Sequence, residues 1–416
     1  MKVLISSVLL GIAPALCAPA AAAGTDVDMS KGGVTFTSGE NSLHLGALAQ
    51  FRWTALDAEQ MDRDTAGPGA GKEDGLSQKF EVRRMRVKLA GTAFRSWLGY
   101  AFQFELGGTE GDRASKINDA IIDIARNPLA SLRLGQFKAP FSLQQLTSSA
   151  SQEFVDRAIT DKRFAPGRDQ GLMLHGRPSG RRFGYEMGAF NGSGESKAQE
   201  DQGLLYAGRL VWDPLGEYKP SESAVDHSGK TLLHFGLSAR TGELIRGTDH
   251  PELFTHPDNE TALGVEGAWT WGRLFAMAEY FRSAAETTDI GPSDPNDPNS
   301  PVAATKGANL RAAGLNVQFG VMVVPGKIEI ALRHAQIDPD DRTAGDKVIE
   351  ERVVFGYFWK GHRLKAQADA GTVTWQRNFG RLSSAARRGL PALTDRLVSG
   401  RELTDAEVRA QMQVAF

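Results

Sequence analysis

Three cations stand at alternate positions in one stretch of the chain, and that spacing could conduct or bind anions. Arg84, Arg86 and Lys88 are each two residues apart within residues 80–91. Alternate side chains of a β-strand share a face, with a step of about 6.6 Å. Such a row would lower the energy of an anion in a narrow aqueous path, provided that each step binds weakly enough for release. Arg83 is out of phase with the row, so we expect it at a rim.

The same cations also have a structural interpretation, because Arg and Lys on a wet strand face can simply pair with nearby carboxylates. The polar faces of the predicted strands carry somewhat more basic than acidic residues. The basic ones are Arg52, Arg84, Arg86, Lys88, Arg133, Arg177, Arg209, Arg240, Arg333, Lys365 and Arg409. The acidic ones are Glu105, Asp119, Asp123, Glu186, Glu266, Glu279, Glu329 and Asp369. This excess alone does not establish anion selectivity.

Apolar and polar residues alternate through most of the chain, which is typical of β-strands with one wet face. We expect sixteen strands, at residues 43–54, 80–91, 98–106, around Ile122 and Ile124, around Leu132 and Leu134, 172–177, 183–190, 205–212, 232–240, 262–271, 274–282, 311–319, 328–333, 353–359, 364–372 and 408–416. The polar faces are rich in charge and the opposite faces are apolar. A water-filled lumen and surrounding lipid explain that contrast better than two packed sheets. The expected fold is therefore all-β, a transmembrane antiparallel barrel of porin size.

The connections between the predicted strands alternate in length, as the periplasmic turns and outer loops of such barrels do. Residues 178–182, 272–273 and 360–363 are short connections, whereas residues 57–79, 241–261, 283–310 and 376–406 are long. A further interruption, residues 138–170, follows the fifth strand, where a large porin folds a loop into its own lumen. We expect a constriction loop there.

Both ends of the sequence indicate export to the bacterial outer membrane. Lys2, a short apolar run and Ala21–Ala23 predict a signal peptide over residues 1–23, followed by a single barrel domain over 24–416. Cys17, the only cysteine, lies in that peptide, so no disulfide is expected. The final stretch alternates and ends on Phe416, as the closing strand of an outer-membrane barrel does. The formal net charge of -2 does not suggest a nucleic-acid partner.

Two regions resemble the phosphate-selective porin O and P family. They are the stretch from Gly135 to Ser149, GQFKAPFSLQQLTSS, and the arginine-rich stretch FEVRRMRVKLAG at residues 80–91. Residues 153–158 and 167–171 are also similar. The resemblance implies a homotrimeric porin in outer-membrane lipid that conducts small anions, phosphate or polyphosphate among them.

The resemblance also implies particular anion contacts. Lys138, Ser148 and Ser149 correspond to contacts from the constriction loop, and Arg84 and Arg133 to contacts from the wall. Guanidinium and ammonium groups meet the charge of phosphate, and serine hydroxyls bind single oxygens. Arg52, Arg86 and Lys88 complete the expected pore-lining set.

Two other functions remain open at this point. One is a general diffusion porin with a transverse field between basic and acidic walls. The other is a lipid-modifying enzyme or an adhesin built on a barrel. No nucleophile–histidine–acid set, no Gly-x-Ser-x-Gly elbow and no metal-ligand spacing of histidines is present in the sequence, so we expect no enzyme activity, no metal and no cofactor.

Overall fold

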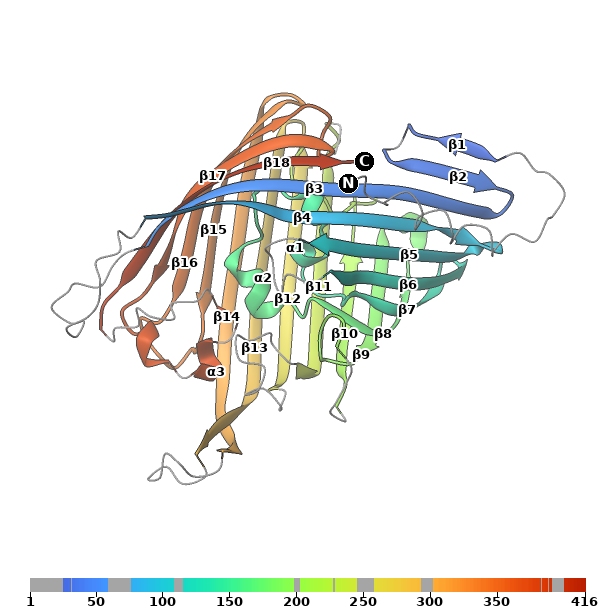
Figure 1. The fold of residues 1–416 in the computed structure, drawn as a ribbon. Helices are drawn as coiled ribbons and strands as arrows, with labels where there is room; N and C mark the ends of the chain where they lie inside the picture. The colour runs from blue at the N-terminus through green and yellow to red at the C-terminus, as the bar shows by residue number, and fades with distance from the viewer. Residues whose placement is uncertain are drawn as a thin grey trace, which may run out of the picture.

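The computed structural model describes residues 25–30, 32–58, 76–107, 115–197, 203–226, 229–244, 258–292, 302–382, 384–387, 389–390 and 400–416. The predicted signal peptide lies outside these residues. Within them, 18 strands form one antiparallel sheet (Figure 1). The strands are β1 (Asp26–Asp28), β2 (Val34–Ser38), β3 (Asn41–Asp57), β4 (Leu76–Ala93), β5 (Arg95–Gly107), β6 (Lys116–Asn127), β7 (Ala130–Lys138), β8 (Arg168–Gly176), β9 (Phe183–Phe190), β10 (Leu205–Trp212), β11 (Leu232–Leu244), β12 (Asp258–Trp271), β13 (Leu274–Pro292), β14 (Val302–Val324), β15 (Ile328–Asp338), β16 (Val348–Phe358), β17 (Leu364–Trp375) and β18 (Leu403–Ala415).

The last strand closes the sheet into a barrel by pairing with β3. Its register with β3 runs from Ala406 opposite Asp57 to Ala415 opposite Leu48. Phe416 then exchanges two backbone hydrogen bonds with Ala47, of 3.0 and 2.7 Å. Within the described residues, the ring of β3 to β18 thus has no open edge, which is how barrels avoid pairing with other chains. Within the described residues, β3 to β18 make the sixteen-stranded barrel, and each of the sixteen predicted strands is confirmed as one of them.

The strand pair β1–β2 was not predicted, because both strands are short and neither shows a long alternation. β2 pairs with the first residues of β3, from Ser38 opposite Asn41 to Val34 opposite Leu45. β18 takes over as the partner of β3 from Leu48 onward. The hairpin therefore stands beside the start of β3 and outside the closed ring (Figure 1).

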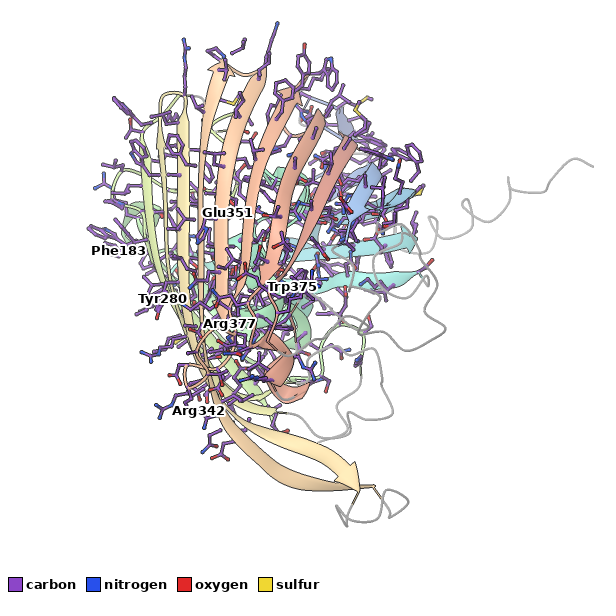
Figure 2. All side chains as sticks on the ribbon, turned by 90° about the vertical axis from the view of Figure 1, so that its left-hand side faces the viewer. Phe183, Tyr280, Arg342, Glu351, Trp375 and Arg377 are labelled. Atoms are coloured by element: carbon purple, nitrogen blue, oxygen red, sulfur yellow. The ribbon has the colours of Figure 1, made fainter. Side chains whose placement is uncertain are left out.

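The barrel places apolar side chains outward, as the predicted alternation requires. In β15, Ile330 and Leu332 are exposed, whereas the alternate residues Ala331 and Arg333 are buried. Side chains such as Phe183 and Tyr280 stand out from the surface of the strands (Figure 2). Phe183, Trp212 and Phe235 form an exposed stack near the short connections, with ring centroids 6.3 and 5.7 Å apart. Aromatic belts of this kind lie at the membrane interface in barrels of this class.

The constriction loop, predicted within residues 138–170, spans residues 139–167 and lies inside the ring (Figure 1). It contains α1 (Leu143–Leu146), the short helix η1 (Ser149–Ser151) and α2 (Ile159–Phe164). It packs against an apolar part of the inner wall. Phe281 of β13 stacks on Phe141 and Phe164 of the loop, with centroids 5.8 and 5.2 Å apart. The ring of Phe164 occupies the space where a Cβ on Gly314 would stand. The loop is therefore seated on β12 to β15 by burial of aromatic surface.

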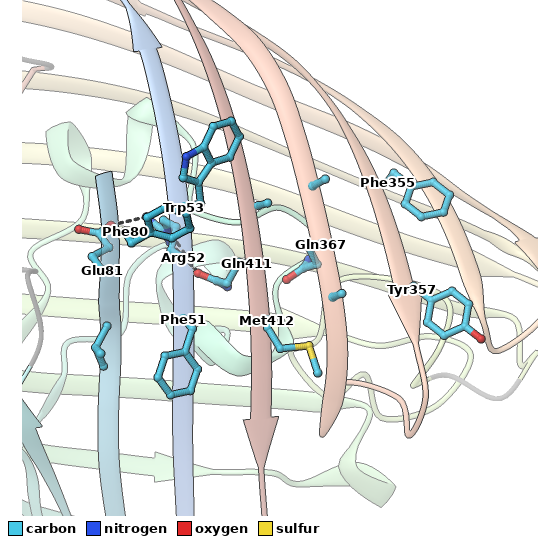
Figure 3. A pocket seen from close by; sticks show the side chains of 14 residues that line it. Phe51, Arg52, Trp53, Phe80, Glu81, Phe355, Tyr357, Gln367, Gln411 and Met412 are labelled. Atoms are coloured by element: carbon cyan, nitrogen blue, oxygen red, sulfur yellow. Dashed lines mark hydrogen bonds and ion pairs between the residues drawn. The ribbon is translucent and has the colours of Figure 1, made fainter. Parts of the chain in front are cut away.

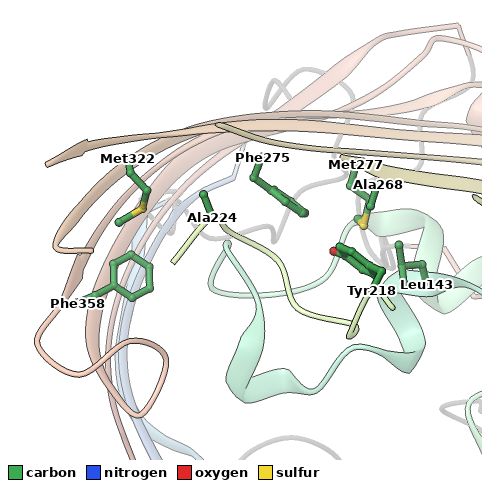
Figure 4. Packing of buried hydrophobic residues seen from close by; sticks show 8 residues of the cluster. All are labelled: Leu143, Tyr218, Ala224, Ala268, Phe275, Met277, Met322 and Phe358. Carbon is green, nitrogen blue, oxygen red and sulfur yellow. The ribbon is translucent and has the colours of Figure 1, made fainter. Parts of the chain in front are cut away.

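A second segment also enters the lumen, which the sequence did not lead us to expect. It lies in the connection from β10 to β11, and we call its described residues, 213–226 and 229–231, the inward segment. Tyr218 and Ala224 of this segment form a buried cluster with Phe275, Met277, Met322 and Phe358 of the wall and with Leu143 of the constriction loop (Figure 4). Two pieces of chain thus fill the lumen beside the same wall.

The close contact between Phe164 of the loop and Gly314 of β14 predicts how the loop can be displaced. Gly314→Val would push Phe164 away, so single-channel conductance in planar bilayers should rise while the barrel still shows heat-modifiable migration on gels. Gly267→Val is the matched control, because a Cβ there meets no atom closer than 3.6 Å. Equal conductance in the two variants would contradict the proposed seating of the loop.

Candidate functional site

A bulge in β4 points two consecutive arginines into the lumen. In the register with β3, Gln50 lies opposite Arg84 but Phe51 lies opposite Val82, so Arg83 is the extra residue. Arg83 Nη2 is 3.4 Å from Asp156 Oδ1 in the constriction loop. The expectation that Arg83 lies at a rim was therefore wrong, because a bulge shifts the phase of the strand by one residue.

Four guanidinium groups converge on the carboxylate of Asp156. The distances are 2.6 Å from Arg52, 3.4 Å from Arg83, 3.6 Å from Arg84 and 3.5 Å from Arg409. Burial by itself would raise the pKa of Asp156, but the four positive charges outweigh it and hold that pKa well below its usual range. We call these five residues the Asp156 cluster. It ties the middle of the constriction loop to β3, β4 and β18.

The predicted cation row continues from this cluster along β4. Arg86 Nε lies 2.5 Å from Glu105, and Arg86 Nη1 donates to the Ser149 hydroxyl at 2.9 Å. Lys88 is the next inward residue; it is exposed, and the described residues provide it with no ion pair. Ser148 is exposed too, and its hydroxyl accepts from the Ala150 N–H at 3.3 Å. The structure thus brings Arg52, Arg84, Arg86 and Ser149 together, with Lys88 and Ser148 beside them.

Lys138 and Arg133 lie elsewhere. The Lys138 ammonium group donates to the backbone oxygens of Gln145, Leu146 and Thr147 at 2.6, 3.3 and 3.1 Å. An ammonium group has three donors, so all of them serve to hold the end of α1. Arg133 makes two hydrogen bonds to Asp123, of 3.0 and 2.6 Å. These contacts make Lys138 an anchor of the loop and place Arg133 on a separate part of the wall.

The charged side chains of the lumen divide into two groups by exposure. On β11 to β17 the pairs Arg240–Glu260, Arg333–Glu350 and Arg352–Asp369 have side chains at most 4% exposed. On β4 to β9 the side chains of Arg84 and Glu105 are only 4% and 8% exposed. Exposures of 13% to 30% are found there for Arg86, Asp119, Asp123, Arg133, Arg168 and Glu186. Water therefore reaches the β4–β9 side, while the constriction loop and the inward segment cover the other side.

Most cations on the open side have an acidic partner. Arg86 pairs with Glu105, Arg168 with Asp119 and Arg133 with Asp123. Glu186 contributes to a further group with Arg209 and Glu266. Fixed charge on this side is thus nearly balanced. Among the described residues, Lys88 is exposed without an ion pair, and Lys138 is held by backbone oxygens alone.

A groove of about 640 Å³ lies on the outer face of the barrel and is distinct from this path (Figure 3). Its walls include Phe51, Trp53, Phe80, Tyr357 and Met412. These side chains belong to the apolar outward face, whereas Arg52 and Gln411 point the other way and hydrogen-bond to each other at 3.2 and 2.9 Å. The groove faces lipid and offers no route for ions.

The model of the phosphate-selective porin O and P family matches residues 56–379. The chain belongs to this family. An uncharacterised protein of Caulobacter vibrioides is 26% identical over 62% of this chain and 52% of its own length. An uncharacterised protein of Aquifex aeolicus is 25% identical over 56% of this chain and 57% of its own. The chain thus spans about half the length of the curated relatives it matches.

Several solved structures share the fold. An anion-selective porin from Comamonas acidovorans superposes with a TM-score of 0.57 at 12% identity, covering 90% of this chain and 100% of that one. The outer-membrane protein OmpT of Vibrio cholerae gives 0.53 at 9% identity, over 91% and 98%. The channel DcaP of Acinetobacter baumannii gives 0.52 at 10% identity, over 90% and 97%.

Family and fold together indicate a porin of the outer membrane, and they point to a channel rather than an enzyme. In the part of the chain that the structure describes, no helix has the length and hydropathy needed to span a membrane. Those residues also contain no group of three or more His, Cys, Asp or Glu side chains placed to hold a metal ion.

Asp156 should limit the anion preference of the pore. Asp156→Asn removes a negative charge that lies among four guanidinium groups but keeps an acceptor oxygen, so the zero-current potential in a KCl gradient should shift toward that of a chloride-selective pore. Glu351→Gln is the control, because that side chain is 69% exposed on the outer face (Figure 2). An unchanged potential in Asp156→Asn would show that the cluster does not act on the permeating ion.

Proposed function

We propose that this porin favours anions and serves the uptake of phosphate or polyphosphate. The observation that carries the proposal is the inward row of Arg84, Arg86 and Lys88, which begins in the Asp156 cluster and ends on an exposed ammonium group without an acidic partner in the described residues. An anion that follows this row passes from the field of the Asp156 cluster to Arg86 and then to Lys88.

The chemistry of the row suits a multiply charged oxyanion. Electrostatic attraction scales with charge, so a doubly charged phosphate gains more than chloride near the same cations. Ser148 and Ser149 lie beside the row, and each hydroxyl can bind a phosphate oxygen. The name of the family and the anion selectivity stated for the Comamonas acidovorans porin support this assignment.

The pairing of the other cations argues for weak binding along the path. Arg86, Arg133 and Arg168 each share their charge with a carboxylate, so each step of the path binds an anion less strongly than a lone arginine would. Weak steps allow release, which conduction requires. Arg52 and Arg84 contribute through the field of the Asp156 cluster rather than by direct contact, since both are buried.

The alternative is a general diffusion porin without phosphate preference. The near balance of paired charges on β4 to β9 favours it, because opposed charges set up a field across the pore instead of a net attraction for anions. We further propose a homotrimer set in outer-membrane lipid. One structure of the Vibrio cholerae OmpT is described as a trimer form, and the fold is shared.

Lys88 should decide between the two functions. Lys88→Glu reverses an exposed charge that has no acidic partner in the described residues. The zero-current potential in a KCl gradient should therefore move toward that of a cation-selective pore, and block of the chloride current by phosphate should fall several-fold. Lys327→Glu is the control, because Lys327 is exposed in the turn between β14 and β15. If phosphate does not block the wild-type chloride current, the general diffusion porin is the better description. If both variants keep wild-type selectivity, Lys88 lies off the path.

A further inference from the structure

The inward segment belongs to the end of the barrel that carries the short connections. Its residue Asp213 pairs with Arg177 in the β8–β9 turn at 2.9 Å. Glu217 pairs with Arg181 in the same turn at 2.8 Å. His362 Nε2, in the turn between β16 and β17, lies 2.8 Å from the backbone oxygen of Glu222. The other connections at this end are brief, so a long segment that turns inward needs a structural reason.

Contacts with the wall and within the segment itself hold the inward segment in place from its root to its tip. Asp213 Oδ1 lies 2.6 Å from His234 Nδ1, and Asp213 Oδ2 accepts from the Tyr218 N–H at 3.1 Å. The Tyr218 hydroxyl donates to the backbone oxygen of Ser221 at 2.6 Å. The Ser223 hydroxyl donates to Glu329 of β15 at 2.7 Å, although Ser223 has a φ of 95°. A non-glycine residue keeps such a backbone angle only where its surroundings hold it there.

The tip of the segment meets the constriction loop through Glu222, which is 1% exposed. Its backbone N–H donates to Ser151 O at 2.9 Å. Its carboxylate accepts from Gln144 Nε2 at 3.2 Å and from the Glu153 N–H at 3.1 Å. The same carboxylate accepts from Gln318 Nε2 of β14 at 3.0 Å. One side chain therefore joins the start of the loop, its middle and the wall.

We propose that the inward segment is a strut that supports the constriction loop from the short-turn end, with Glu222 as the positioning residue. Gln144 and Glu153 lie in different parts of the loop, so a common acceptor holds them at a fixed separation and keeps the loop folded back on itself. The strut thereby sets the width of the open side without contacting the permeating ion. This inference rests on the channel function of the family and not on a preference for phosphate.

The test compares Glu222→Ala with Glu217→Ala. Each variant removes one carboxylate from the same segment. Glu217, however, pairs with Arg181 of the β8–β9 turn and, among the described residues, makes no hydrogen bond or ion pair with the loop. In planar bilayers Glu222→Ala should raise open-channel current noise several-fold and broaden the conductance distribution, while Glu217→Ala stays close to wild type. Hydrogen–deuterium exchange should rise in peptides from residues 143–157 and remain unchanged in β14. Glu222→Gln, which keeps one acceptor oxygen without the charge, should give an intermediate noise level.

Two results would overturn the strut. One is wild-type noise and exchange in Glu222→Ala. The other is a shift of the zero-current potential at unchanged noise, shared by Glu222→Ala and Glu222→Gln, which would make Glu222 a charge in the ion path. If Glu222→Ala does not reach a heat-modifiable state, Tyr218→Phe serves instead. It removes the hydroxyl that donates to Ser221 within the segment, and it should raise noise to a smaller extent. If phosphate does not block the wild-type current, the proposed substrate is refuted and the strut is unaffected.

Discussion

The convergence of four arginines on Asp156 is the interaction on which the rest of the lumen depends. Guanidinium groups that are nearly buried need an anion, and Asp156 supplies it from the constriction loop. Removing one partner of such a buried arrangement typically costs roughly 3–5 kcal/mol, so the pairing strongly favours the loop in its inward position. The position of the loop then decides which wall water can reach.

Two kinds of packing divide the lumen. Aromatic burial seats the constriction loop on β12 to β15, where Phe281 and Gly314 form an apolar surface. Arg163 of the loop also pairs there with Glu260 of β12 at 3.2 Å. The inward segment fills the adjoining space through Tyr218 and Glu222. The remaining side, β4 to β9, keeps its charges wet and mostly paired. The pore is therefore shaped by apolar contacts and buried ion pairs on one side, and it takes its electrical character from the water-exposed ion pairs on the other.

Alternation alone predicted the sixteen strands of the ring and the inward faces of Arg52, Arg84, Arg86 and Lys88. It could not reveal the bulge at Arg83, because a bulge breaks the very period that is being read. Lys138 was expected to contact anions, but its partners are backbone carbonyls, which leave no trace in residue types. The inward segment escaped notice because Glu222 and Ser223 resemble the residues of any solvated loop. In the sequence, only its length distinguishes this connection, because it is longer than the other turns at the same end of the barrel.

Cysteine accessibility tests the division of the lumen most directly. Lys88→Cys and His175→Cys place a thiol on the open side, and Ser238→Cys and Ser283→Cys place one on the covered side, where both serines are at most 4% exposed. In planar bilayers a charged methanethiosulfonate reagent should change the current through the first two variants within seconds to minutes and leave the last two unchanged. Equal reaction at all four positions, or reaction confined to Ser238→Cys and Ser283→Cys, would contradict a water path along β4 to β9.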